Sequence, residues 1–376
     1  MNAIIKENSL KRLEALGQSI WLDYIRRDFI SKGELRRTIE NDGISGLTSN
    51  PSILEKAIAE SDLYDKDIQE MAQKKMDVKT IYEFLSQRDV ADAADEFRPL
   101  YDKTGGEDGY VSLEVNPHLA HHTKGTIDEA RRLWAALNRP NVFIKVPATI
   151  EGLPAIRQLI GEGINVNVTL LFGLPRYRQV AQAYIDGLEA RSSQGKPIKT
   201  IASVASFFLS RIDTLVDPLI EKHIANTDEK IEIAKKIHGQ IAIASAKAAY
   251  QIYKEIFESN RFQKLAAKGA KTQRLLWAST GTKNPAYSDV KYIETIIGPC
   301  TINTVPLKTL SAYRDHGNPK LTLEQDTKQA EWVMAQLPKL GIGIDNVTQQ
   351  LEDEGVKKFN EPFDKLMETL SDKMGN

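Results

Sequence analysis

Cysteine is almost missing from this chain: Cys300 is the one cysteine among 376 residues. A single thiol cannot form an internal disulfide, which is typical of proteins in a reducing compartment. The six histidines are scattered, and only His121 and His122 lie near each other. Adjacent residues do not share a helix face, so no zinc-type cluster can be recognised. We therefore expect neither a metal ion nor a cofactor.

Long apolar runs and an excess of one charge are missing as well. No stretch of about 18 apolar residues occurs, so the sequence does not predict a membrane span. The first 18 residues contain no apolar core of signal-peptide length. The formal net charge is −1, which argues against a basic surface for nucleic acid or membrane. We expect a cytoplasmic protein with a small-molecule substrate, present as a monomer or a homodimer.

Short apolar, β-branched runs recur along the chain, and most are bounded by Gly, Pro, Asn or Asp. Eight runs have the length of a strand: 19–25, 43–50, 109–115, 141–148, 163–172, 200–208, 274–280 and 300–306. The segments between them have helical patterns. The clearest are 229–257, which has one apolar face, 126–137, which opens on Thr126, and a helix that begins near Pro51 with Asn50 or Ser52 as its cap.

Alternating strands and helices predict an α/β fold with a parallel sheet and helices outside it. Eight such units indicate a closed (β/α)₈ barrel, the TIM barrel. The structural rival is a doubly wound open sheet. The Gly-rich phosphate fingerprint of the dinucleotide folds is missing after the first strand, which counts against that rival.

The whole chain, 1–376, is predicted to be one barrel domain. An N-terminal helix within 1–18 precedes the first strand, and a helical extension, 320–376, follows the last. Within the extension, 323–337 is predicted to be helical with Thr322 as its cap. Asp345 could cap a second helix that runs toward Phe359, and Pro362 is expected to interrupt the pattern before 363–373 resumes it.

Polar residues gather near the expected carboxyl ends of the strands, where barrel enzymes carry their active sites. Among them, Lys145 lies in the apolar run Val-Phe-Ile-Lys-Val-Pro. Lysine is rarely buried without a reason, and burial favours the neutral amine, which attacks carbonyl groups. The alternative is a structural ion pair between Lys145 and Glu114, and position alone does not decide between the two.

Other polar residues have ordinary alternatives too. Asp23 could cap the segment after the first strand, and Asn50 could simply cap the helix that Pro51 begins. Asn167 and Thr169 are harder to explain structurally, because amide and hydroxyl groups that face a barrel interior need partners. A substrate or an ordered water would supply such partners.

Four segments together resemble the transaldolase family. They are GLTSNPSI (46–53), VSLEV (111–115), FIKVPAT (143–149) and NVTLLF (167–172). The resemblance covers roughly residues 10–310, and the chain length and the insertions resemble the longer bacterial type. It implies a transferase of the non-oxidative pentose phosphate pathway. Such an enzyme moves a dihydroxyacetone unit from sedoheptulose 7-phosphate or fructose 6-phosphate to glyceraldehyde 3-phosphate or erythrose 4-phosphate.

The resemblance also implies catalytic roles. Lys145 would attack the ketose C2 carbonyl and form a Schiff base, and Asp23 would accept the proton of the C4 hydroxyl during cleavage. Glu114 and Thr169 would hold a water that shuttles protons while the imine forms and breaks. No metal is needed, because the iminium accepts the electrons of the broken bond.

Substrate-binding roles follow in the same way. Asn50 and Asn167 would bind the hydroxyls of the dihydroxyacetone unit. Ser206 and Arg211 would bind the substrate phosphate, Phe208 would line the pocket, and Ser279 would lie in the same region.

One departure concerns the phosphate. Shorter family members are expected to use a second arginine after strand seven, but ASTGTKNP (278–285) contains none. Lys283 could substitute as a point charge. Arg274 precedes the strand and is expected at the other end of the barrel.

Two rival functions remain at this stage. A fructose-6-phosphate aldolase would use the same lysine but release dihydroxyacetone. Such relatives are expected to carry glutamine and tyrosine where this chain has Glu114 and Phe208, so these two residues favour transfer. The second rival is a non-catalytic barrel that binds sugar phosphates, because fold does not determine function.

Overall fold

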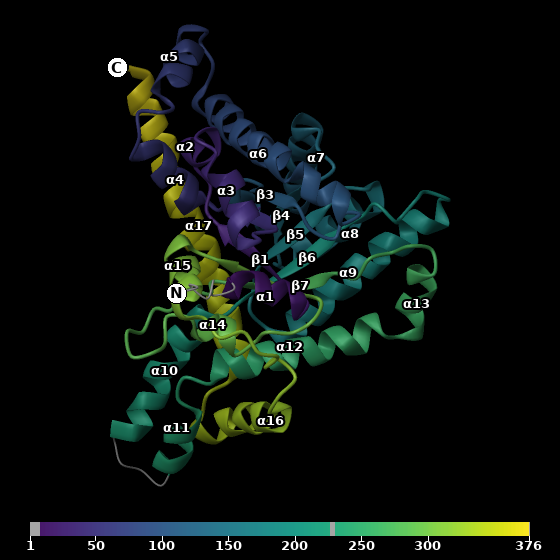
Figure 1. Ribbon diagram of the computed structural model, residues 1–376, viewed down its shortest axis with the longest axis vertical. Coiled ribbons are helices and arrows are strands. Elements are labelled where there is room, and N and C mark those ends of the chain that lie inside the picture. Colours follow the sequence, from purple (N-terminus) through teal and green to yellow (C-terminus); the bar gives the residue numbers. More distant parts are fainter. Residues whose placement is uncertain (1–7, 226–229, 376) are drawn as a thin grey trace, which may run out of the picture.

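The strands close into a parallel barrel in the computed structural model, which describes residues 8–225 and 230–375 (Figure 1). Each strand pairs with its neighbour in chain order, and β1 closes the barrel against β8. The strands are β1 (Gln18–Asp23), β2 (Gly46–Thr48), β3 (Tyr110–Glu114), β4 (Val142–Pro147), β5 (Val166–Leu171), β6 (Ser203–Phe208), β7 (Arg274–Ala278) and β8 (Thr301–Val305). The predicted (β/α)₈ fold is confirmed, and closure excludes the open sheet.

Helices surround the barrel on its outside (Figure 1). They are α1 (Ser9–Ala15), α2 (Arg27–Ser31), α3 (Glu34–Asp42), α4 (Pro51–Ala59), α5 (Asp65–Gln73), α6 (Val78–Lys103), α7 (Thr123–Leu137), α8 (Gly152–Glu162), α9 (Leu174–Ser193), α10 (Ser210–Ala225), α11 (Ile231–Ile237), α12 (Ile241–Phe257), α13 (Asn260–Ala266), α14 (Lys291–Glu294), α15 (Leu307–His316), α16 (Thr327–Gln336) and α17 (Ile344–Gly375), with 3₁₀ turns η1 (Pro117–Leu119) and η2 (Leu337–Leu340). No helix in the described ranges has the length and apolar character that a membrane span requires.

The floor of the barrel is an aromatic layer. The rings of Trp21, Tyr110 and Phe143 lie with centroids 4.3 to 6.4 Å apart. Gly46 pairs with Trp21 in the strand register, and a Cβ at Gly46 would lie 2.4 Å from the indole. Because side chains alternate along a strand, the residues two positions after Trp21 and Phe143 face the same interior, one layer higher. This layer carries the polar residues of the site.

Three of the predicted helix boundaries were wrong, each for a local reason. The helix predicted over 229–257 is divided into α11 and α12, because Gly239 adopts a left-handed φ of 70° between them. The helix predicted to open on Thr126 begins at Thr123, and His122 accepts the hydrogen bond of the cap. The helix predicted from 323 begins at Thr327, because the Thr322 hydroxyl donates to the Glu294 carbonyl instead.

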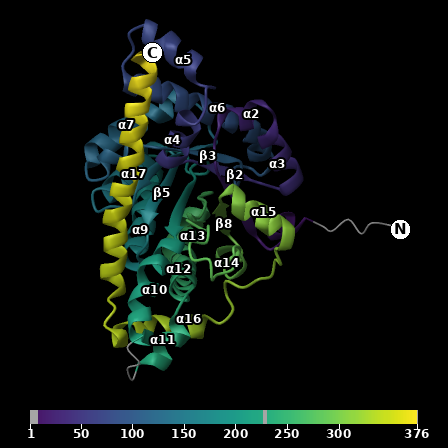
Figure 2. The same cartoon turned by 90° about the vertical axis from the view of Figure 1, so that its left-hand side faces the viewer.

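The C-terminal extension also differs from the prediction, because α17 continues through Pro362 to Gly375. A proline inside a helix removes one hydrogen bond. Here α17 packs against α4, α5, α6 and α10 along its length, and this packing outweighs the lost bond. Figure 2 shows α17 running along one side of the molecule toward α5. The N-terminal helix predicted within 1–18 is α1, and residues 1–7 of that prediction lie outside the described residues.

Candidate active site

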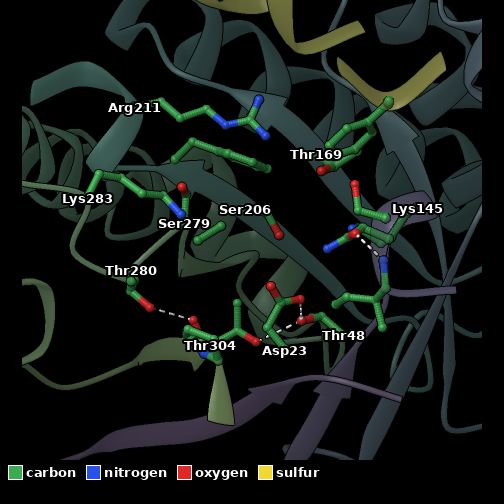
Figure 3. Close-up of a pocket in the computed structure, with 18 of the residues that line it drawn as sticks. Asp23, Thr48, Lys145, Thr169, Ser206, Arg211, Ser279, Thr280, Lys283 and Thr304 are labelled. Atoms are coloured by element: carbon green, nitrogen blue, oxygen red, sulfur yellow. Dashed lines mark hydrogen bonds between the residues drawn. The ribbon is translucent and has the colours of Figure 1, made fainter. Parts of the chain in front are cut away.

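A cavity of about 410 Å³ lies at the carboxyl ends of the strands (Figure 3). Its lining includes nine of the residues predicted for the site: Asp23, Asn50, Lys145, Thr169, Ser206, Phe208, Arg211, Ser279 and Lys283. The other two are buried against this lining. Glu114 faces Lys145, and Asn167 contacts Ser206. The structure therefore brings all the predicted residues together, from strands and loops distant in the sequence.

Lys145 projects from β4 into the cavity and is 5% exposed. Its Nζ donates a hydrogen bond of 2.9 Å to the Ser49 carbonyl and lies 3.6 Å from Glu114 Oε2. Register places Glu114 directly beside Lys145 on the adjacent strand. Both Glu114 carboxylate oxygens are buried without a hydrogen-bond partner among the described residues. A purely structural buried ion pair needs those lone pairs satisfied, so this pair has capacity for a further partner.

Burial raises the pKa of both carboxyl groups of the site. Burial raises the pKa of Glu114 to about 7, Lys145 opposes the shift, and Asp23 adds to it. Burial also raises the pKa of Asp23, while a hydrogen bond from Thr48 and the charges of Lys145 and Lys283 lower it. A carboxyl group whose pKa lies near neutrality, as that of Glu114 does, can both accept and return protons.

Hydroxyl groups fix the orientation of Asp23. Thr48 donates a 2.7 Å hydrogen bond to Asp23 Oδ1, and its oxygen lies 2.8 Å from the Thr304 hydroxyl. Thr280 donates to the Thr304 carbonyl at 2.7 Å, which ties β7 to β8 (Figure 3). Asp23 was considered as a possible helix cap, but its carboxylate accepts this hydrogen bond from Thr48 instead. Sequence reasoning missed Thr304, although it lies near the carboxyl end of β8, as its counterparts do on the other strands.

Asn167 is held inside the barrel by two hydroxyl groups. Ser206 donates to its Oδ1 at 2.6 Å, and its Nδ2 donates to Ser112 at 3.1 Å. Ser206 was expected near the phosphate, but its proton is used by Asn167. The Thr169 hydroxyl lines the cavity and has no partner in the described ranges. Immediately after it, Leu170 adopts a φ of 53° where β5 bulges against β6.

A cationic end of the cavity lies opposite Lys145, where Figure 3 shows Arg211, Ser279 and Lys283. The Arg211 guanidinium lies over the rings of Phe208 and Phe359, at 5.6 and 5.9 Å. Its Nη1 is buried without a hydrogen-bond partner among the described residues, and burial lowers the pKa of the guanidinium. A partly buried guanidinium with a nitrogen that has no hydrogen-bond partner is suited to an anion such as a phosphate.

Phe359 was not predicted for the site. It belongs to α17, and its ring lies 6.0 Å from Lys145 Nζ. The sequence around Phe359 does not mark it as a site residue, because more than one whole helix separates it from the last strand. Lys56, on α4, also lines the cavity and was missed.

Asn50 fulfils the capping role considered for it. Its side chain accepts the Ile53 amide at 3.0 Å at the start of α4, and it also lines the cavity. Its side-chain amide nitrogen remains available to donate. Arg274 lies at the amino end of the barrel, as predicted, where it donates to Ser19 and to the Thr301 carbonyl.

No group of three or more metal-ligating side chains that could hold an ion occurs within 8–225 and 230–375.

Comparisons with known proteins agree with the architecture of the site. Residues 20–370 match the family model described as Transaldolase/Fructose-6-phosphate aldolase. The chain is 50% identical over 371 residues to a transaldolase of Trichodesmium erythraeum, and the match covers 98% of each chain. It is 48% identical over 372 residues to transaldolase 2 of a Nostoc species, again over 98% of both chains. Identity to a transaldolase of Thiobacillus denitrificans is 47% over 360 residues, which are 96% of this chain and 99% of that protein.

Proposed function

Because the chain belongs to the transaldolase/fructose-6-phosphate aldolase family, we propose that its cavity transfers a dihydroxyacetone unit between sugar phosphates through a Schiff base on Lys145. Its near-full-length relatives are named transaldolases, so transaldolase is the function that they support. The observation that carries the mechanism is the buried Lys145 beside a carboxylate whose oxygens are not committed to protein partners.

The chemistry begins when the neutral Lys145 amine adds to the C2 carbonyl of the ketose. The carbinolamine then loses its hydroxyl as water, and Glu114 supplies the proton through a water that Thr169 helps to hold. Asp23 next removes the C4 hydroxyl proton, the C3–C4 bond breaks, and an aldose phosphate leaves. The electron pair of that bond passes into the iminium and gives an enamine, which remains covalently attached to Lys145.

Transfer reverses these steps with a second aldose. The enamine carbon adds to the aldehyde of the acceptor, and Asp23 returns its proton to the new hydroxyl. Water then hydrolyses the iminium with the help of Glu114. Asn50, which lines the cavity, and Asn167, whose Nδ2 has one N–H beyond the one it donates to Ser112, would bind the hydroxyls of the retained unit.

Arg211 is proposed to bind the phosphate of donor and acceptor, with Ser279 and Lys283 beside it. Because these groups lie at the end of the cavity opposite Lys145, the substrate would bind with its ketone end at the lysine and its phosphate end at the cations. For Ser206 we propose a role other than phosphate binding. Its hydroxyl donates a hydrogen bond to Asn167 and so positions that side chain.

Location and assembly remain proposals. A cytoplasmic location agrees with the single cysteine of the chain. For the oligomeric state, a monomer or a homodimer remains the expectation.

Product analysis with and without an acceptor tests transfer directly. We expect fructose 6-phosphate and erythrose 4-phosphate together to give sedoheptulose 7-phosphate and glyceraldehyde 3-phosphate at a steady rate. With fructose 6-phosphate alone, glyceraldehyde 3-phosphate should appear in a burst of about one equivalent per site, because the enamine is retained. Steady release of free dihydroxyacetone would instead indicate an aldolase. Binding of fructose 6-phosphate with neither product would indicate a non-catalytic barrel.

A further inference from the structure

The loop between β7 and α14 carries Lys283 and is fixed by a buried network on the outside of the barrel. Tyr287 donates a 2.6 Å hydrogen bond to Asp217 Oδ2 on α10. Asp217 Oδ1 in turn accepts the Gly239 amide at 2.9 Å, in the break between α11 and α12. Burial raises the pKa of Asp217, and the Tyr287 hydroxyl and the Gly239 amide oppose that shift.

A lysine gives the loop its second anchor. Lys291 Nζ lies 2.8 Å from Asp213 Oδ2 and donates to the Gly239 carbonyl at 2.6 Å. The same ammonium lies 3.7 Å from the centroid of the Tyr287 ring. Tyr292 also donates to Asp213, at 2.8 Å. Two carboxylates of α10 and one glycine therefore hold both Tyr287 and Lys291.

Gly239 allows this arrangement in two ways. Its left-handed φ of 70° turns the chain sharply between the two helices. A Cβ at this position would lie 2.6 Å from the Tyr287 hydroxyl oxygen, so any larger residue would displace the ring. The tyrosine packs directly onto the backbone that it helps to hold.

The hydrogen bonds that hold Tyr287 also restrict the backbone at Lys283, because the segment between the two residues is closed by a further hydrogen bond. Thr282 donates a 2.9 Å hydrogen bond to the Ser288 carbonyl, which joins the neighbour of Lys283 to the neighbour of Tyr287. At its other end the loop is tied to β8 by Thr280. Lys283 lines both the substrate cavity and a second cavity of about 270 Å³ that contains Asp213, Asp217 and Tyr287.

We propose that Tyr287 is a positioning residue that, with Asp217, holds Lys283 against the phosphate end of the substrate cavity. A lysine is a flexible point charge, unlike the planar fork of an arginine. Fixing the backbone on both sides of Lys283 lowers the entropy that phosphate binding must remove. This inference rests on the proposed function, because it takes the anion at Lys283 to be the substrate phosphate.

The test measures whether Tyr287 and Lys283 act on the same binding step. Tyr287→Phe removes the hydroxyl and should raise KM for fructose 6-phosphate roughly tenfold, as expected for loss of a hydrogen bond to a charged group. The inhibition constant for inorganic phosphate should rise by a similar factor, and kcat should change by less than about twofold. In a Lys283→Ala background, Tyr287→Phe should have no further effect on either constant.

Tyr184→Phe provides the matched control. The Tyr184 hydroxyl donates a 2.7 Å hydrogen bond to the Lys271 carbonyl and does not line the substrate cavity. We expect this variant to lose stability and keep its KM. Thr282→Val, at a more exposed position, opens the loop without disturbing the buried network and should reproduce the KM effect if Tyr287→Phe folds poorly.

Each contrary outcome has a distinct meaning. Equal effects of Tyr287→Phe with and without Lys283, or a loss of stability alone, would overturn the positioning role. An unchanged KM in Lys283→Ala would overturn it as well, because Lys283 would then make no contribution to phosphate binding. In both cases formation of sedoheptulose 7-phosphate by the unaltered protein would still support transfer, so the two proposals fail separately.

Discussion

Glu114 is a residue whose acid–base chemistry is changed strongly by its surroundings. In water a glutamate is ionised at neutral pH, but burial beneath the substrate cavity raises the pKa of Glu114 to about 7. Lys145 limits the shift and Asp23 increases it. The group can therefore give a proton to a leaving hydroxyl and take one from water within the same catalytic cycle.

This pKa predicts how Schiff-base formation depends on pH. Below about pH 7 Glu114 is protonated, and in the proposed mechanism this is the proton that dehydration of the carbinolamine needs; above pH 7 the proton is lost. The rate of imine formation should therefore fall as the pH rises through 7. Glu114→Gln should lower the rate by roughly 10²- to 10⁴-fold and remove this fall. Rapid-mixing measurements between pH 5.5 and about 9 would check both, a range that spans the expected pKa. A fall of the same size and position in Glu114→Gln would assign the ionisation to another group.

Lys145 and Glu114 could be predicted from the sequence because each stands among apolar strand residues, where a charge is unusual. Thr304 also lies in a predicted strand, but it is uncharged, so the sequence does not distinguish it from its neighbours. Ser206 was identified as a site residue, but the sequence does not say that its hydroxyl donates a hydrogen bond to Asn167 on the adjacent strand.

Helix α17, in the C-terminal extension, also contributes to the candidate active site. It contacts β5 and the helices around it, and it places Phe359 between Lys145 and Arg211. One aromatic ring thus contacts both ends of the substrate cavity. It keeps water away from the amine and supports the unpaired guanidinium by a cation–π contact.

Phe359→Leu tests this contribution. We expect KM for fructose 6-phosphate to rise roughly tenfold, because the cation–π contact with Arg211 is lost and the cavity becomes wetter. Phe363→Leu is the matched control. It lies one turn further along α17 and packs edge-on against Tyr82, 5.3 Å away, outside the lining of the cavity. The control should lose stability and retain KM, as measured by steady-state kinetics and thermal unfolding. Identical kinetic changes in the two variants would mean that Phe359 acts only through the packing of α17.

The types of element were easier to predict than their ends. Apolar periodicity identified every strand, and it identified the helical stretch near 229–257. It could not reveal the break at Gly239, because the apolar spacing continues on both sides of it. The error at Pro362 is the opposite one: the proline suggested a break in the helix, but tertiary packing keeps α17 continuous there. Both errors arise where contacts with distant segments outweigh the local signal.

At the scale of the whole molecule, the barrel supports the site through its aromatic floor. Trp21, Tyr110 and Phe143 fill the interior below the polar layer, and Trp21 is fully buried. A rigid apolar floor keeps water from entering beneath Lys145 and Glu114, which maintains the desolvation that shifts the pKa of Glu114.

Gly46→Ala tests this packing. The new methyl group would lie 2.4 to 2.7 Å from indole atoms of Trp21, so the floor must shift at a cost of roughly 1–3 kcal/mol. Gly161→Ala is the control. It lies inside α8, where a Cβ would meet its nearest neighbour at an ordinary 3.5 Å, and it should add about 0.5–1 kcal/mol of stability. Urea unfolding would measure both. Equal stability changes would contradict the account of the floor.

In the proposed function Lys145 holds the transferred unit covalently, and this can be tested directly. The protein is incubated with fructose 6-phosphate, reduced with borohydride and digested, and the adduct is located by peptide mass spectrometry. We expect a three-carbon dihydroxyacetone adduct on Lys145, in the peptide that spans β4, and no adduct in Lys145→Met. An adduct on a different lysine, or none in folded protein that binds the sugar phosphate, would contradict it.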